Sequence, residues 1–406
     1  MPLVTLDKDV QTESANLDAA FYPTRPAALQ THDAYPLGIE FTGSGSEYFR
    51  IWIVNLMLLF ITLGIYYPWA KVRRLRYFHT NTLVGGEPLN FHGRPIAMLK
   101  GYLLVGAMFA IYSVAGNFSS MAGLIAFGLV AAVSPALLKS SMQFRLANTS
   151  WRGMRFRFKG TLNGAYRAVL PLFFPGLVIL AAVVGVVDRN KPPTWYLITV
   201  GVVGGVTLVV LPWLMFNLKR YQHNHYALGM LQTRFNATLG SFYGLFFKIA
   251  AFVLLPFVGI SGAAVLVLYF AKNSDGGMLS KAIIAVTLGF AAFAVLIAML
   301  VMVKPFAVSR MQNLVWSRTS NESIRFTSQL RFSSLLWLTL KNWLLVVLTF
   351  GFYLPFAAIA VARLRLQSVT LETAQHPDDL VNQWPTVEGD AAGEAAGDLF
   401  GLDIGF

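Results

Sequence analysis

The chain has 406 residues, of which 56% are hydrophobic and only 13% are charged, and its mean hydropathy is +0.57. Water-soluble domains carry about 25% charged residues, so this composition excludes a soluble protein and indicates an integral membrane protein. The chain has no cysteine, which excludes disulfide bonds, thiolate nucleophiles and cysteine-based metal sites.

The net charge of +13 is unevenly distributed along the chain. Residues 1–47 hold seven acids and two bases, and residues 371–406 hold eight acids and no base. The segment between them therefore carries 30 of the 32 Lys and Arg residues. We expect acidic, mostly disordered tails over residues 1–37 and 372–406, and a basic membrane domain over residues 38–371.

Six apolar stretches are long enough to cross a bilayer, which takes about 20 residues. They run over about 96–115, 121–143, 166–187, 195–217, 243–271 and 280–303. The longer connecting segments are rich in Lys and Arg, namely 71–94, 139–167, 218–248 and 304–331. Because positive loops stay in the cytoplasm, we expect a multi-pass bacterial inner-membrane protein with both termini in the cytoplasm.

Two further apolar segments share a Thr-x-Gly-x-Tyr-x-Pro phrase. It stands in "FITLGIYYPWA" (60–70) and again in "VLTFGFYLPFA" (347–357). The glycines Gly64 and Gly351 permit a backbone reversal, and Pro68 and Pro355 suit the start of a returning helix. Thr62 and Thr349 bear hydroxyl groups that satisfy main-chain groups at such a turn. We therefore predict two short re-entrant hairpins; the alternative is a single tilted span with a proline kink in each segment.

Five prolines near the ends of apolar segments mark an internal repeat: Pro68, Pro135, Pro212, Pro305 and Pro355. Polar residues follow them at fixed spacing. Eight residues on stand Arg76, Gln143, Arg220, Asn313 and Arg363, and thirteen on stand Asn81, Asn148, His225, Arg318 and Ser368. Each unit opens on a Phe-x-Gly-like phrase, at Phe41, Phe91, Phe158, Phe235 and Phe326. This self-similarity predicts five hairpin repeats, over about 41–90, 91–157, 158–234, 235–325 and 326–371.

The predicted fold class is thus an all-α polytopic membrane protein with internal helical-hairpin repeats. It has six full transmembrane helices, two short re-entrant hairpins and small β-strand arms on the cytoplasmic side. The arms follow the prolines, where alternation in "RFRF" and the turn residues "GGEP" favour short strands. We expect several of these strands to pair into a small sheet beneath the membrane.

The chain resembles the YjgN-like family of bacterial inner-membrane proteins, which are built on a domain of unknown function. The resemblance is carried by "GIEFTGSGSEYF", "LGIYYPWAKVRRLRYFHTNTLVGGEPLNFHG" and "FGFYLPFAAIAVARLRLQSVTLE". It covers most of residues 38–371 and implies an inner-membrane location. It implies no substrate, cofactor or catalytic residue.

Candidate ligand-binding residues fall into two groups. Asn55, Tyr66, Asn342 and Tyr353 lie in the two end segments, where the asparagines are placed to bond the turn or each other. Arg50, Lys100 and Arg167 each stand nine residues after the phenylalanine of their unit. Cations at one depth suit phosphate, carboxylate or lipid headgroups, although basic side chains also snorkel to the interface merely as topology anchors.

The sequence offers little support for catalysis. No Asp or Glu stands within the apolar spans, which disfavours proton-coupled transport and acidic selectivity rings. His223 and His225 lack a third ligand nearby, so we expect no metal and no cofactor. The aromatic-rich basic arms suit lipid better than nucleic acid.

These features predict a transporter or channel-like protein for a small or anionic solute. The alternative is a membrane scaffold that binds anionic lipids, and a membrane-embedded enzyme ranks third. Membrane lipids, through their anionic headgroups, are the expected partners, and the oligomeric state does not follow from the sequence.

Overall fold

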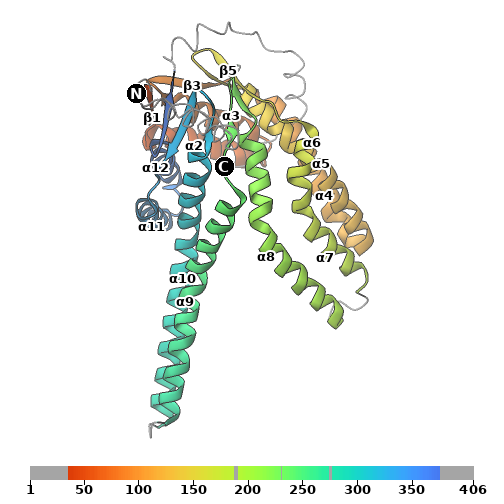
Figure 1. Cartoon of the computed structure of the whole chain (residues 1–406), viewed down its shortest axis with the longest axis vertical. Coiled ribbons are helices and arrows are strands. Elements are labelled where there is room, and N and C mark those ends of the chain that lie inside the picture. The colour runs from red at the N-terminus through yellow and green to blue at the C-terminus, as the bar shows by residue number, and fades with distance from the viewer. Residues whose placement is uncertain (1–34, 187–190, 230, 274–276, 375–406) are drawn as a thin grey trace, which may run out of the picture.

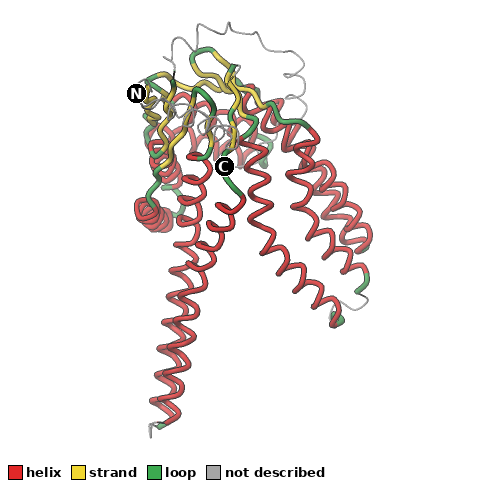
Figure 2. The backbone as a smooth tube through the Cα atoms, viewed as in Figure 1, coloured by secondary structure: helices red, strands yellow, loops and turns green. Residues whose placement is uncertain are grey.

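A computed structural model describes residues 35–186, 191–229, 231–273 and 277–374 (Figure 1). Antiparallel strands gather at one end of the molecule, and helices project from them and return (Figure 2). The predicted tails lie outside the described residues, except that the first strand begins at Tyr35 and the last ends at Thr373.

The strands form one continuous sheet, in the order β7-β6-β5-β4-β3-β2-β1-β11-β10-β9-β8. Its outermost strands, β7 and β8, are separated in the chain only by Thr233, so the sheet is a nearly closed ring. The strands are β1 (Tyr35–Phe41), β2 (Thr82–Val84), β3 (Glu87–Phe91), β4 (Thr149–Trp151), β5 (Met154–Phe158), β6 (Tyr226–Leu228), β7 (Leu231–Gln232), β8 (Arg234–Phe235), β9 (Thr319–Ser320), β10 (Ile324–Ser328) and β11 (Val369–Thr373). The all-α class is therefore wrong in this respect: an eleven-stranded sheet joins the helices together.

The helices follow the predicted order along the chain. They are α2 (Gly45–Ile61), α3 (Tyr67–Thr80), α4 (Pro95–Phe118), α5 (Ser120–Ala147), α6 (Leu162–Val169), the 3-10 turn η1 (Leu170–Phe173), α7 (Phe174–Val184), α8 (Thr194–His223), α9 (Leu239–Asn273), α10 (Met278–Ser317), α11 (Phe332–Leu348) and α12 (Leu354–Gln367). Within the described residues, six helical segments are long and apolar enough to cross a membrane, as predicted.

The order strand, helical segment, helical segment, strand recurs five times along the described chain, and we call each recurrence a unit. In every unit the strand before the first helix pairs with the strand after the second. The paired residues at this junction are Phe41–Thr82, Phe91–Thr149, Phe158–Tyr226, Phe235–Thr319 and Ser328–Val369. The first helix begins four residues after the first member of each pair.

This register corrects the phrase expected for the fifth unit. Ser328, and not Phe326, occupies the position that phenylalanine holds in the other four units. Phe326 lies two residues earlier in β10 and pairs with Leu371. The motif "FTS" therefore resembles the phrase by its letters but is out of register with it.

The concave side of the sheet is filled by apolar side chains. Leu37, Trp151 and Met154 are buried in one cluster, and Leu228 of β6 and Leu371 of β11 pack against it. The Trp151 indole N–H donates to the Val84 carbonyl at 3.0 Å, which fixes the ring across a neighbouring strand. The sheet is thus a packed core from which the helices diverge (Figure 2).

The first and fifth units are short hairpins with matching turns. Gly64 and Gly351 adopt φ angles of +91° and +93°, which favour glycine. The Thr62 hydroxyl donates to the Leu58 carbonyl at 2.7 Å and accepts from the Tyr66 N–H at 3.1 Å. Thr349 makes the equivalent bonds in the fifth unit, at 2.7 and 3.0 Å. The predicted roles of glycine and threonine at these turns are confirmed, and both segments leave the sheet and return to it.

Candidate functional site

Asn55 and Tyr66 belong to the two arms of the first hairpin, Asn55 in α2 and Tyr66 as the residue that caps α3. Asn55 is buried on α2, and its Oδ1 accepts from Nη1 of Arg73 on α3 at 3.3 Å. Tyr66 stacks on Trp69 with 6.0 Å between ring centroids, and the Arg73 guanidinium lies 6.0 Å from the Tyr66 ring. The Asn55–Arg73 bond ties the two helices of this hairpin together, and the ring contacts of Tyr66 lie within the start of α3.

Asn342 and Tyr353 occupy the matching places in the fifth unit. The Asn342 amide donates to the Ala357 carbonyl at 3.5 Å. Its Oδ1 is buried and has no hydrogen-bond partner among the described residues. Tyr353 stacks on Phe356 with 5.4 Å between ring centroids. The two asparagines therefore bond within their own hairpins and not to each other.

The two end hairpins nonetheless pack side by side. The ring centroids of Phe49 in α2 and Phe356 in α12 are 5.8 Å apart, and those of Trp52 and Phe352 are 6.5 Å apart. The contact between them is aromatic, and the candidate polar residues Asn55 and Asn342 take no part in these ring pairs. The structure thus joins the hairpins without bringing the four predicted residues into one polar site.

Arg50, Lys100 and Arg167 are equivalent in the structure. Each is the sixth residue of its helix, in α2, α4 and α6, and each is exposed. A rise of 1.5 Å per residue puts all three about 8 Å from the helix start. They therefore lie at one level below the sheet, on three different units.

The sequence also places Lys248 and Lys341 slightly deeper in the first helices of the fourth and fifth units. Counted from the corrected positions, both lie thirteen residues on, after Phe235 and Ser328. That is four residues beyond the level of Arg50, so they lie on the same helix face, one turn deeper. Both are exposed. Each unit thus carries one base on this face of its first helix, and we call these five residues the basic belt: Arg50, Lys100, Arg167, Lys248 and Lys341.

A second set of polar residues joins neighbouring units. Arg76 donates to the Gly93 carbonyl at 3.4 Å, and Arg363 donates to the Gly43 carbonyl at 2.8 Å. Asn313 donates to the Leu330 carbonyl at 3.0 Å. All three donors stand eight residues after their proline, and each acceptor stands at the same place in the next unit. The spacing was visible in the sequence, but the partner of each residue was not.

The predicted histidine pair has a structural role. His223 is buried against Trp316, Phe235 and Tyr226, and its Nδ1 lies 3.0 Å from the Thr319 hydroxyl. The His225 ring instead bonds the Tyr221 carbonyl at 2.7 Å, as the Asn81 and Asn148 amides bond the equivalent carbonyls of their units. Among the described residues no cluster of three metal-binding side chains occurs.

Acidic groups in the described chain lie near the sheet. Glu40, Glu87 and Glu372 are on strands, Glu322 is in a turn, and Glu47 is in the first turn of α2, where it accepts from the Tyr77 hydroxyl at 3.1 Å. None of them lies in a helix that is long enough to cross a membrane. The described spans therefore contain no carboxylate that could relay protons or act in general acid catalysis.

Comparison with known proteins agrees with this architecture. The inner membrane protein YjgN of Salmonella typhimurium strain LT2 is 25% identical over 359 residues, covering 82% of this chain and 87% of that protein. The YjgN of Escherichia coli strain K12 is 25% identical over 240 residues, covering 55% of this chain and 58% of that protein. No solved structure matches the chain. The model of the bacterial proteins of unknown function DUF898 matches residues 36–399, so the chain belongs to that family, as the YjgN-like resemblance predicted.

Proposed function

We propose that this protein resides in the bacterial inner membrane and binds anionic phospholipid headgroups through the basic belt. The observation that carries the proposal is the placement of one exposed base on the same helix face in all five units. A surface ring of bases attracts anionic lipid by about 1 kcal/mol per charge. Simple snorkelling explains a base at each helix end, but it does not require the same face in every unit.

In the proposed topology the sheet lies on the cytoplasmic side and six helices cross the bilayer. Large apolar side chains on these helices face outward; Leu208, Phe247 and Phe290 are 73%, 75% and 71% exposed. Lipid is the environment that such surfaces require. Because β1 and β11 pair along the sheet, both tails leave from the same region, which we place in the cytoplasm.

The end hairpins in this topology enter the bilayer and return. Their tips are apolar, with Leu63 93% exposed and Phe350 94% exposed. Thr62 and Thr349 each satisfy one main-chain carbonyl and one N–H at their turn, and a turn within the membrane needs such partners. A single tilted span would carry the chain across the membrane and away from the sheet to which each hairpin returns.

Transport, which the sequence analysis ranked first, is the second candidate, because irregular backbone at membrane depth often lines a pathway. The residues proposed for such a path, Asn55 and Asn342, bond within separate hairpins. The concave side of the sheet is closed by Leu37, Trp151 and Met154. These features favour lipid binding over passage of a solute through the ring.

The test removes the basic belt by replacing its five residues with glutamine: Arg50, Lys100, Arg167, Lys248 and Lys341. We expect the wild-type protein in native mass spectrometry to retain phosphatidylglycerol and cardiolipin in preference to phosphatidylethanolamine. The belt variant loses that preference because no charge remains at headgroup level.

A control variant loses the same charge from exposed residues of the sheet: Arg155, Arg157, Arg234 and Arg325 on strands, and Lys159 directly after β5. It should keep the lipid preference of the wild type. Equal lipid retention by the belt and control variants would refute the proposal, since the position of the bases would then be irrelevant.

A further inference from the structure

Three positions form the core at the junction of each unit with the sheet. The first is the strand end already described, the second lies seven residues later, and the third lies nine residues after the proline. In the first four units these trios are Phe41, Tyr48 and Tyr77; Phe91, Met98 and Phe144; Phe158, Ala165 and Tyr221; and Phe235, Phe242 and Leu314. Each contains at least two aromatic rings. The fifth trio, Ser328, Leu335 and Leu364, contains none.

The third position has a specific partner in two units. The Tyr77 phenol oxygen accepts from the Ser44 main-chain N–H at 2.9 Å, and Ser44 is the residue that caps α2. The Tyr221 phenol donates to the carbonyl of the equivalent cap, Thr161, at 3.1 Å. A tyrosine ring therefore fills the space between the two helices of the unit, with its hydroxyl at the helix cap.

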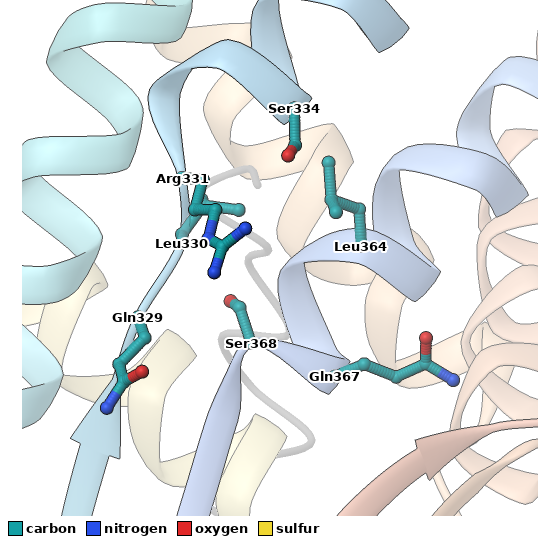
Figure 3. A pocket seen from close by; sticks show the side chains of 7 residues that line it. All are labelled: Gln329, Leu330, Arg331, Ser334, Leu364, Gln367 and Ser368. Carbon is teal, nitrogen blue, oxygen red and sulfur yellow. The ribbon is translucent and has the colours of Figure 1, made fainter.

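The fifth unit has an open cavity of about 180 Å³ at this place (Figure 3). It is lined by Gln329, Leu330, Arg331, Ser334, Leu364, Gln367 and Ser368. Leu364 is the counterpart of Tyr77, Arg331 of Ser44 and Ser334 of Glu47. The cavity thus lies where the first and third units hold a tyrosine side chain, and the Arg331 guanidinium extends into it (Figure 3).

We propose that the cavity beside Leu364 binds a small phenolic molecule, whose ring takes the place that Tyr77 and Tyr221 fill in their units. The size fits, since an apolar cavity of about 150 Å³ in a protein core is known to bind benzene. Leu330 and Leu364 supply apolar contact, the main-chain N–H of Arg331 has the position from which Ser44 donates, and its guanidinium can stack on the ring. The site is independent of the basic belt.

The test titrates 4-fluorophenol into the detergent-solubilised protein and follows its fluorine NMR signal. We expect saturable binding to one site in the wild type. L364Y restores the residue of the sister units and should abolish saturable binding while the protein keeps its helical circular dichroism. R331Q should weaken binding about threefold, the size expected for an exposed cation–π contact.

Controls separate this site from other causes. L348Y adds a tyrosine at an exposed position of α11, 64% exposed and outside the cavity lining, and should bind like the wild type. L364F is a second filling variant in case L364Y folds poorly. The belt variant should also bind normally, which separates this proposal from lipid recognition. Non-saturable partition that is equal in wild type, L364Y and L364F would show that the ring merely dissolves in detergent, and would overturn the proposal.

Discussion

At the junction of strand and first helix, two positions hold a large and a small side chain, and their order is reversed in the fifth unit. In the Phe-x-Gly phrase the ring lies over the glycine; a Cβ on Gly43 would come within 2.8 Å of Phe41, and one on Gly93 within 2.5 Å of Phe91. In the fifth unit Ser328 replaces the phenylalanine, and Leu330, only 3% exposed, stands at the glycine position. Large and small side chains have changed places, so the local volume is roughly conserved.

This exchange predicts strong coupling between the two positions. S328F alone should destabilise by about 1–3 kcal/mol because the new ring meets Leu330. L330G alone should cost at least the ~2–5 kcal/mol of a buried leucine truncation. The double variant S328F/L330G recreates the phrase of the other units. It should lose clearly less free energy of unfolding than the sum of the losses in the two single variants.

The measurement is thermal unfolding of the two single variants and the double variant in one detergent. Pairing S328F with L348A, an exposed site on the same unit, gives an additive control. Additivity of S328F and L330G would contradict the shared space inferred from the register.

His79 gives the folded protein a pH dependence. Burial lowers the pKa of its imidazole below the ordinary 6.5, and the charge of Arg145 lowers it further, while a hydrogen bond to the Leu75 carbonyl opposes the shift. The unfolded chain then binds a proton just below pH 6.5 that the folded chain does not. Stability therefore decreases as the pH falls through this window.

H79L should reduce the loss of stability at low pH, because it removes the imidazole that titrates. Leucine should fit there, since it occupies the equivalent position in the second and fifth units, at Leu146 and Leu366. The measurement compares melting temperatures at about pH 8 and about pH 5.5, on either side of the histidine pKa. The pKa of His92 is lowered as well, mainly by burial, so some dependence should persist in H79L. An unchanged difference between the two pH values would rule out His79 as a contributor.

Among the elements, the hairpin turns have a demanding backbone geometry. Two consecutive residues have positive φ at each tip, Leu63 with Gly64 and Phe350 with Gly351. Leu63 and Phe350 are in the left-handed conformation, which destabilises the folded state by about 1–2 kcal/mol for a residue with a side chain. The following glycines avoid a second such cost.

G64A and G351A should each destabilise the protein by about 1–2 kcal/mol, since alanine has the same restriction at positive φ. G106A is the matched control, because Gly106 lies within α4 with no atom near its would-be Cβ. Alanine there should stabilise by up to about 1 kcal/mol. Loss of stability in all three variants alike would mean that the turn conformation is not the cause.

Sequence reasoning succeeded where the controlling interactions are local. The reversal at Gly64, the threonine bonds and the six long apolar helices depend on neighbouring residues, and the printed pattern contains them. The sheet depends on pairs far apart, such as Tyr35 with Thr373, and no local pattern encodes that closure. Phe326 was mistaken for the start of the fifth unit because "FTS" resembles the Phe-x-Gly phrase of the other units. The register is set instead by the pairing of Ser328 with Val369.

For the candidate site, the same limit applies. The equal spacing of Arg50, Lys100 and Arg167 was visible in the sequence, because each depends on one strand and one helix start. The cavity beside Leu364 was not visible, since its lining residues come from the start of α11 and the end of α12, which are separated along the chain. A sequence can list the aromatic residues of each unit, but only the fold shows which three share one space.

For the whole molecule, the five units behave as segments of one ring. Bonds from Arg76, Asn313 and Arg363 pass from one unit to the next, and Arg363 joins the last unit to the first. The pairing of β1 with β11 closes the ring at the same junction. A ring built this way holds the helices only at one end, which explains why they diverge from the sheet toward their far ends (Figure 1).

The topology proposed for this ring can be tested with single cysteines, because the chain has none of its own. A membrane-impermeant maleimide added to intact spheroplasts should label N117C, at the far end of α4, from the periplasm. E87C, on a strand of the sheet, should react only after the membrane is opened. L63C and F350C, at the hairpin tips, should remain unlabelled in both cases because lipid covers them, yet react once the protein is dissolved in denaturant. Labelling of F350C from the periplasm would mean that the fifth unit crosses the bilayer, and labelling of E87C there would invert the whole ring.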